Sequence, residues 1–243
     1  MTAEPRSRGV YERFVKRPLD CFLALFALLV LSPILIVVAV LVRVNLGSPI
    51  LFTQIRPGKI DPKTGRERLF RLYKFRTMTD ARDASGELLP DDVRLTKFGA
   101  FLRSSSLDEL PELLNIAKGD MAVIGPRPQL VRDMTFMTQE QRRRHEVLPG
   151  LSGLAQISGR NAARWEDKLA ADLKYVEKIR FCEDVRIIFV TFLKVFKREG
   201  IAEEGFATAQ DFGDYLLAEG KIDAAQYQAG QDEAKRLLDE AKL

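Results

Sequence analysis

The stretch FLALFALLVLSPILIVVAVLV, residues 22–42, decides the class of this protein. It contains no charged residue and meets the length of about 20 apolar residues that a membrane helix needs. A helix of a soluble protein would carry a polar face, which this stretch lacks. It is longer than the apolar region of a removable signal peptide, and no small-residue cleavage site follows it. Hydropathy therefore predicts a membrane-embedded segment.

Ser32-Pro33 lies in the middle of this stretch and bears on its path. One reading is a straight helix over Leu19–Asn45 that crosses the bilayer once. Proline, however, removes a backbone donor and clashes with the carbonyl of Leu29, which favours a kink. Each arm is then about 20 Å long, too short to cross alone, and basic residues flank both ends. We therefore predict a re-entrant helix-break-helix within residues 1–45, in which the Ser32 hydroxyl helps to satisfy a carbonyl freed at the bend.

Composition narrows the chemistry that the rest of the chain can perform. The 243 residues are 46% apolar and 30% charged, which is typical of a folded protein and not of a disordered one. Two cysteines, Cys21 and Cys182, exclude a disulfide scaffold and a cysteine-rich zinc site. The single histidine, His145, argues against multi-histidine metal sites and histidine-activated nucleophiles. Acid, base and metal-ligand roles therefore fall to Asp, Glu, Lys and Arg.

Charge is distributed unevenly along the chain. The net charge of +4 combines a body, residues 1–200, of net +10 with an acidic C-terminal part, residues 201–243, of net −6. A basic body favours an anionic partner: nucleic acid, an anionic membrane surface or a phosphorylated small molecule. Motifs typical of nucleic-acid binding do not occur, nor does a P-loop or a dinucleotide-binding fingerprint. We therefore expect phosphorylated ligands and no nucleic acid.

The pattern of the remaining chain predicts an α/β fold that is mostly helical with a short β-hairpin. The hairpin is expected from strands at Gly47–Arg56 and Arg68–Tyr73, joined by the turn formers of residues 61–65. Residues 209–243 are expected to form an acidic helical tail appended to the body at 46–208, with a capping box at Asp223 and Gln226. We read His145 as solvated or in a loop contact, and Trp165 as a packing or membrane-interface residue. Helices are predicted at Lys97–Arg103, Leu107–Lys118, Thr138–Val147, Trp165–Arg180 and Val185–Arg198.

The segment SSSLDELPE, residues 104–112, has two interpretations. Ser106 and Glu109 match the S-x-x-E capping box, an ordinary structural feature. Alternatively, Asp108 at a helix N-terminus keeps a low pKa and serves as an ionised nucleophile. Glu109 would then hold a divalent cation, since Mg²⁺ takes one or two carboxylates and completes its shell with substrate phosphate and water. This segment alone leaves both interpretations open.

Basic side chains elsewhere make a phosphate site plausible. Arg127 lies between two prolines, which limits the freedom of its loop and lets the guanidinium meet phosphate at little entropic cost. Each such residue taken alone is an ordinary surface charge, whereas the set accounts for a basic body attached to a membrane segment. The other candidates are Lys74, Arg76, Arg94, Arg103 and Arg160.

With these residues in view, the chain resembles the bacterial sugar transferase family, the monotopic phosphoglycosyl transferases, from about Tyr11 to Thr208. Each motif is short, and their common order makes the resemblance specific. Ala122 and Ala155 depart from the family pattern, and the stretch around Gly159–Ala162 is similar to small, bacillosamine-type members. The motifs are Lys16-Arg17-x-x-Asp20, Ser32-Pro33, Gln54-x-Arg56-x-Gly58, Tyr73–Met78, Arg103–Pro111, Lys118–Met121, Gly125–Pro128, Pro149–Gly153 and Gln156-x-x-Gly159-Arg160.

This resemblance implies a reaction and a location. Family members move a sugar 1-phosphate from a UDP-sugar to undecaprenyl phosphate, release UMP and so begin the assembly of a glycoconjugate. The resemblance implies a re-entrant helix packed on a compact catalytic domain, residues 46–208, with interfacial amphipathic helices. That domain would face the cytoplasm at the bacterial inner membrane, in contact with its lipids. Mg²⁺ is the implied cofactor, and a second copy of the chain or downstream glycosyltransferases are further partners to expect.

The resemblance also assigns roles to residues. Asp108 matches the nucleophile that forms a covalent phosphosugar–aspartate, and Glu109 matches the Mg²⁺-binding half of the pair, with Asp108 beside it. Lys74 and Arg127 match phosphate contacts, and Asp172 or Asp184 matches an acid that lines the site. The basic residues Arg76, Arg94, Arg103 and Arg160 are added as substrate-binding candidates.

Two alternatives from other classes remain. One is a non-enzymatic membrane adaptor whose basic face binds acidic lipid, and the other is a lipid-phosphate phosphatase that uses water as the acceptor. The sequence does not reveal the sugar. It predicts that truncation after Thr208 leaves the chemical step intact.

Overall fold

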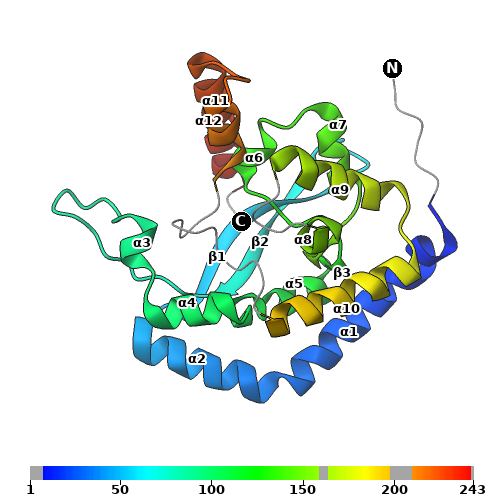
Figure 1. Cartoon of the computed structure of the whole chain (residues 1–243), viewed down its shortest axis with the longest axis horizontal. Helices are drawn as coiled ribbons and strands as arrows, with labels where there is room; N and C mark the ends of the chain where they lie inside the picture. The colour runs from blue at the N-terminus through cyan, green and yellow to red at the C-terminus, as the bar shows by residue number, and fades with distance from the viewer. Residues whose placement is uncertain (1–7, 159–163, 198–209, 242–243) are drawn as a thin grey trace.

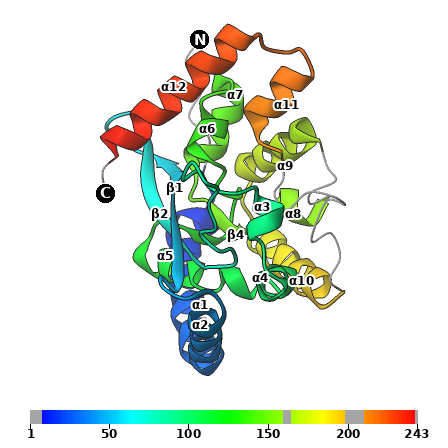
Figure 2. The same cartoon turned by 90° about the vertical axis from the view of Figure 1, so that its left-hand side faces the viewer.

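The computed structural model describes residues 8–158, 164–197 and 210–241. The protein is mostly helical, with an antiparallel hairpin at its centre (Figure 1). A bent helix pair, α1 and α2, lies along one side of the body, and the C-terminal helices α11 and α12 lie on the opposite side (Figures 1 and 2). The predicted class, helical with a short hairpin, is therefore confirmed. The elements are α1 (Lys16–Val30), α2 (Ser32–Leu46), β1 (Leu51–Ile60), β2 (Glu67–Phe75), α3 (Asp91–Arg94), α4 (Lys97–Ser104), α5 (Glu112–Lys118), β3 (Ala122–Ile124), α6 (Val131–Met134), α7 (Gln139–Arg142), β4 (Gly150–Ser152), α8 (Leu154–Ser158), α9 (Trp165–Glu177), α10 (Phe181–Lys197), α11 (Phe212–Ala218) and α12 (Ala224–Glu240), with short turns of other helix types at Tyr11–Val15, Leu107–Glu109 and Arg143–Glu146.

The predicted break in the apolar segment is confirmed. Helix α1 ends at Val30, α2 begins at Ser32, and the two parts of the segment are bent by 65°. Pro33 stands in the first turn of α2, where a missing backbone N–H costs nothing. The Ser32 hydroxyl donates to the carbonyl of Leu29 over 2.8 Å, and this is the carbonyl that the proline leaves without a helical partner.

One face of the bent pair packs on the body and the other is open. Ala24 of α1 is fully buried against Phe70, Leu72 and Ile116, and Val42 of α2 is fully buried in a cluster with Phe75 and Leu102. Large apolar side chains on the outer face are exposed, including Phe22, Leu29, Ile36 and Val44. Within the described residues, no single helix is long and apolar enough to span a membrane, although the bent pair passes that test of length and composition as a unit.

Two further helices carry exposed apolar side chains, as amphipathic interfacial helices would. On α10, Phe181, Phe189 and Phe192 are more than half exposed, and on α4 Phe101 is nearly half exposed. Ile187, on the inner face of α10, is fully buried with Tyr175 and Val176 of α9. Contact of these helices with a membrane surface stays a prediction.

The hairpin forms as predicted but with different bounds. Strand β1 begins and ends four residues later than the predicted Gly47–Arg56, and β2 extends the predicted Arg68–Tyr73 by one residue at its start and two at its end. Strands β1 and β2 pair antiparallel from Leu51 opposite Phe75 to Ile60 opposite Glu67, with an irregularity after Pro57. A second sheet joins β3 and β4 in parallel. The backbone segments at this sheet approach so closely that a Cβ atom on Gly150 would lie 2.1 Å from the backbone nitrogen of Gly125. This contact fixes the start of the Gly125–Pro128 loop.

Several local predictions need correction. The predicted helix Leu107–Lys118 is divided into a short 3-10 turn and α5, and Thr138–Val147 becomes α7 followed by another 3-10 turn. His145 is not solvated: it is buried and its Nδ1 lies 3.1 Å from Glu67. Burial lowers the pKa of His145 to about 4, so its ring is neutral at pH 7.

The C-terminal helices pack on the body and do not hang from it as an appendage. Phe212 of α11 is 2% exposed and its ring lies 5.0 Å from that of Trp165. Ala234 of α12 is buried against Val131 and Met134 of α6. The predicted capping box of α12 is confirmed, since Asp223 and Gln226 bond each other's backbone amides.

Candidate active site

Asp108 and Glu109 lie on a tight turn between α4 and α5. Ser106 adopts a left-handed backbone conformation (φ 55°) and its side chain makes no capping hydrogen bond. In the turn that follows, Leu107–Glu109, the Glu109 carboxylate contacts Lys74 at the end of the hairpin. The capping-box interpretation is therefore wrong, and the Glu109 side chain binds Lys74 and Arg127.

Glu109 is the centre of a charge network drawn from three elements. Lys74, at the end of β2, donates to Glu109 Oε1 over 2.7 Å. Arg127, from the loop after β3, pairs with both oxygens of Glu109. Burial works to raise the pKa of Glu109, but the charges of Arg127 and Lys74 prevail and hold it well below its usual range. Glu109 is therefore ionised and fixed between two cations.

Asp108 has a different environment from its neighbour. It is 8% exposed, and its carboxyl makes no ion pair within the part of the chain that the structure describes. Burial, followed by the charge of Glu109, raises the pKa of Asp108 to about 6. The expected low pKa of Asp108 is thus wrong, because burial and the neighbouring charge of Glu109 disfavour the ionised form. At pH 7 the carboxylate remains mostly ionised and, being partly desolvated, is a stronger nucleophile than one in water.

Glu112 is a site residue that the sequence analysis missed. It is 2% exposed at the start of α5, and its Oε1 lies 3.3 Å from Lys74 Nζ. Burial raises the pKa of Glu112 to about 7. Its signal in the sequence was its spacing: three residues after Glu109, it falls on the same side of the turn. Lys74 is therefore shared by two acids.

A cavity of about 1270 Å³ contains this network. Its walls bring together most of the residues that the sequence singled out, and it exceeds the usual volume of small-molecule sites, about 300–1,000 Å³. Arg160 lies outside the described residues. The predicted residues that line the cavity are Lys74, Arg76, Arg94, Arg103, Asp108, Glu109, Arg127 and Asp172.

Three of the lining arginines also hold the surrounding loops, two of them through backbone carbonyls. Arg76 donates to the carbonyls of Ser48 and Met78 and to Asp80. Arg94 donates to the carbonyl of Thr79 over 3.0 Å and to Asp91. The Arg103 guanidinium donates to the Thr77 hydroxyl, and its positive charge works to lower the pKa of Asp108. Arg103 is therefore the one of these three whose charge bears on the candidate nucleophile.

The two candidate acids lie in different places. Asp172 lines the cavity and is bound by Arg144 through two hydrogen bonds of 2.6 and 2.9 Å. Asp184 is not among the lining residues. It is buried behind the site, where it accepts hydrogen bonds from Tyr11, Lys16 and Tyr175. The structure thus brings Asp172 together with Asp108 in one cavity, and Asp184 joins the N-terminus to α9.

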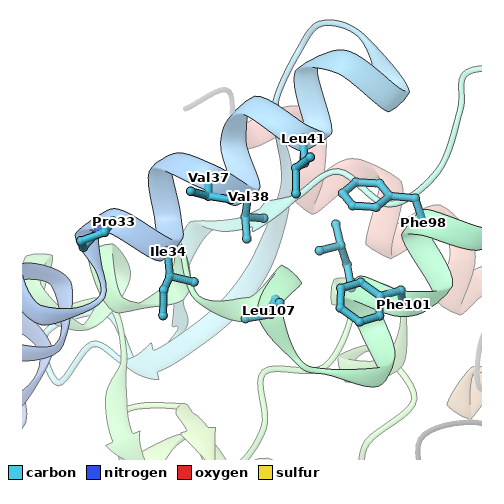
Figure 3. Close-up of a pocket in the computed structure, with 9 residues that line it drawn as sticks. Pro33, Ile34, Val37, Val38, Leu41, Phe98, Phe101 and Leu107 are labelled. Carbon is cyan, nitrogen blue, oxygen red and sulfur yellow. The ribbon is translucent and has the colours of Figure 1, made fainter.

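An apolar groove reaches the site from the side of the bent pair. It has a volume of about 340 Å³ and runs between α2 and α4 (Figure 3). Leu107, next to Asp108, lines both this groove and the polar cavity. The groove lining consists of Pro33, Ile34, Val37, Val38, Leu41, Phe98, Phe101, Leu102 and Leu107.

The carboxylates suit a metal that binds mainly through a substrate. Among the described residues, no group of three or more His, Cys, Asp or Glu side chains is arranged as a metal site. Mg²⁺ commonly uses one or two carboxylates and completes its shell with phosphate oxygens and water. Asp108 and Glu109 would supply that number, with Glu109 sharing its oxygens with Lys74 and Arg127. A preformed metal cage is not what these residues offer.

Comparison with known proteins agrees with this geometry. The model of the family described as "Bacterial sugar transferase" matches residues 11–198. An uncharacterized sugar transferase, EpsL, of Bacillus subtilis (strain 168) is 47% identical over 198 residues, which cover 82% of this chain and 95% of that protein. The exopolysaccharide production protein PSS of Rhizobium leguminosarum bv. phaseoli is 38% identical, over 76% of this chain and 96% of that protein.

A longer relative has a named reaction. The UDP-glucose:undecaprenyl-phosphate glucose-1-phosphate transferase of Klebsiella pneumoniae is 37% identical over 191 residues. The match covers 74% of this chain and 40% of that protein. The family match over residues 11–198 contains the bent pair, the hairpin and most of the residues that line the cavity.

Proposed function

The chain belongs to the bacterial sugar transferase family, and from that premise we propose that it transfers a sugar 1-phosphate from a UDP-sugar to undecaprenyl phosphate and releases UMP. Relatives named for this reaction on undecaprenyl phosphate support the proposal. They use different sugars, so the sugar of this chain stays open. The enzyme class is phosphoglycosyl transferase, and the relative named for exopolysaccharide production supports a role at the start of such synthesis.

The observation that carries the proposal is the position of Asp108. Its buried carboxyl lines the cation-rich cavity, and the neighbouring residue Leu107 lines both this cavity and the apolar groove. A water-soluble, doubly charged donor suits the cavity, and a prenyl chain suits the groove. Asp108 is therefore the candidate nucleophile nearest to the sites suited to both substrates. An adaptor needs no nucleophile, and a lipid-phosphate phosphatase needs no cavity large enough for a nucleotide sugar.

We propose two successive displacements at Asp108. A carboxylate oxygen attacks the β-phosphorus of the UDP-sugar, the bond from that phosphorus to the bridging oxygen breaks, and UMP leaves with that oxygen. The product is an acyl phosphate that links Asp108 to the sugar phosphate. A phosphate oxygen of the lipid then attacks the same phosphorus and releases the carboxylate. Separating the steps avoids the direct approach of two anionic phosphates.

The surrounding residues have roles that follow from their contacts. Arg127 and Lys74, already fixed by Glu109, present positive charge where the diphosphate would lie. Preorganised charge of this kind needs no rearrangement during the reaction. Mg²⁺, held by Glu109 with Asp108 beside it, would supply further neutralisation of phosphate charge.

The membrane arrangement is also part of the proposal. The exposed apolar face of the bent pair would lie in the lipid of the bacterial inner membrane, and the body would face the cytoplasm, where UDP-sugars are made. The 65° bend and the Ser32–Leu29 bond support a re-entrant path, because they accommodate the break within the helix pair itself.

A UMP-release assay separates this function from the alternatives. The purified protein, with Mg²⁺, is given UDP-glucose, UDP-galactose, UDP-N-acetylglucosamine or UDP-N-acetylgalactosamine, with and without undecaprenyl phosphate. A transferase shows sustained UMP release only when both substrates are present. An adaptor releases no UMP from any donor, and a phosphatase releases inorganic phosphate from the lipid alone; either result would overturn the proposal.

A further inference from the structure

The C-terminal segment lies outside the family match yet reaches the cavity. The family model ends at residue 198. The match to the Bacillus subtilis relative covers 95% of that protein, so the unmatched part of the relative is too short to form two helices such as α11 and α12. Gln210 and Asp211, at the start of this segment, nevertheless line the same cavity as Asp108 and Arg127. This wall of the cavity is therefore an addition to the family pattern.

The segment is held firmly at the point where it meets the cavity. The backbone amide of Phe212 donates to Asp133 Oδ1 over 2.8 Å, and the other oxygen of Asp133 accepts from the amide of Leu130 over 2.9 Å. Trp165 Nε1 donates to the carbonyl of Gln210. Asp133 thus ties the segment to the chain that follows Arg127, so Asp211 has a defined position.

The Asp211 side chain does not cap the helix that it precedes. It occupies the N-cap position of α11, where an aspartate ordinarily accepts a hydrogen bond from the first turn, but its side chain makes no such bond. Instead its carboxylate pairs with Arg132, another lining residue, and its side chain is 16% exposed. Burial, with the charge of nearby Asp133, raises the pKa of Asp211 to about 6. Asp211 is therefore a carboxylate of the cavity wall, held beside Arg132 and not used to cap its own helix.

The position of the segment indicates which substrate it meets. Helices α11 and α12 lie on the side of the body opposite α1 and α2 (Figure 2). In the proposed function the prenyl chain of the acceptor takes the apolar groove beside α2, so the far side of the cavity is left to the soluble donor. A carboxylate repels a diphosphate but accepts hydrogen bonds from hydroxyl groups, which a nucleotide sugar carries on its ribose and its sugar.

Building on the proposed function, we propose that the C-terminal segment completes the donor pocket and that Asp211 accepts hydrogen bonds from hydroxyl groups of the UDP-sugar. Asp211 is thus a specificity-determining residue supplied by a part of the chain that the family model does not contain. Phe212 and Asp133 act as positioning residues for it.

The test compares Asp211→Asn with Glu219→Gln, which removes the same charge from an exposed position just after α11. KM and kcat are measured for the best UDP-sugar and for undecaprenyl phosphate. A charged hydrogen bond contributes about 1.5–3 kcal/mol, so donor kcat/KM should fall about 10- to 100-fold in Asp211→Asn. The KM for the lipid should stay within about twofold of wild type, and Glu219→Gln should match wild type.

Inhibition by UDP locates the hydroxyl groups. If the inhibition constant for UDP is higher in Asp211→Asn than in wild type, Asp211 binds the ribose. If that constant is unchanged and the KM for the UDP-sugar is raised, Asp211 binds the sugar. Both results support the proposal. A merely structural role predicts a lower melting temperature and equal effects on both substrates, which would overturn it. Asp211→Glu, which keeps the charge, serves if Asp211→Asn does not fold, and its donor preference across the four UDP-sugars should change. If the wild type is active and the variants have the same donor KM, this inference is refuted and the proposed function stands. If the wild type turns over no UDP-sugar, the proposed function is refuted as well.

Discussion

Replacing Asp172 with asparagine should destabilise the protein strongly. The Asp172 and Arg144 side chains are only 3% and 1% exposed, and two hydrogen bonds of 2.6 and 2.9 Å join them. Asparagine keeps the shape and loses the charge, so the Arg144 guanidinium is left buried without its counter-ion. Breaking a buried pair in this way costs about 3–5 kcal/mol. For a chain of this size, each kcal/mol lowers the melting temperature by about 2–4 °C.

Thermal unfolding in one detergent at one scan rate measures the effect. We expect Asp172→Asn to melt roughly 10 °C below wild type. Asp167→Asn, which changes an exposed position of the same helix, should melt within about 2 °C of wild type. Replacing both members of the pair, with Asp172→Leu and Arg144→Met, should recover much of the loss, because no buried charge then remains unpaired. Equal melting temperatures for Asp172→Asn and wild type would refute the reasoning.

Three further predictions follow from the site and the fold. Because only the ionised Asp108 is a nucleophile and its pKa is about 6, donor kcat/KM should fall about tenfold for each unit below pH 6; a pH profile that stays flat down to pH 4.5 would contradict this assignment. Truncation after Thr208 should leave kcat largely unchanged but lower the melting temperature and raise donor KM, since Phe212 and Asp211 are lost; unchanged values of both would show that the tail is dispensable. In intact cells, single cysteines at Thr2 and Ser85, in a background without native cysteines, should both be protected from an impermeant maleimide; labelling at Thr2 alone would mean that the segment crosses the membrane.

The sequence predicted the break and the hairpin because both depend on local chemistry. Pro33 cannot donate to the carbonyl of Leu29 in a continuous helix, and the freed carbonyl is within reach of the Ser32 hydroxyl next to the proline. Likewise, two strand-like runs joined by turn formers have few ways to pair. These elements need no knowledge of the rest of the fold.

The state of the acids could not be predicted in the same way. The pKa of Asp108 depends on burial and on the charge of Glu109, and Glu109 in turn is fixed by Lys74 and Arg127 from distant parts of the chain. A local motif such as a capping box carries no information about these partners. The same holds for His145, which the sequence indicated to be solvated or in a loop contact and which packing buries beside Glu67.

The role of the C-terminal helices was also hidden from the sequence. An acidic, polar composition is typical of a solvated appendage, and nothing in the local sequence around Phe212 indicates its burial against Trp165. The contact joins residues far apart in the chain, so only the folded structure shows that Asp211 reaches the cavity.

The mass of the intact protein after reaction with a UDP-sugar tests the central claim most directly. Wild type is mixed with its best donor and Mg²⁺, without undecaprenyl phosphate, quenched and analysed by mass spectrometry together with Asp108→Asn. The account predicts that wild type gains the mass of one sugar phosphate, that peptide mapping places it on Asp108, that addition of undecaprenyl phosphate removes it, and that the folded Asp108→Asn protein gains nothing. An adduct on another residue, or UMP release by Asp108→Asn at an appreciable rate, would contradict the account.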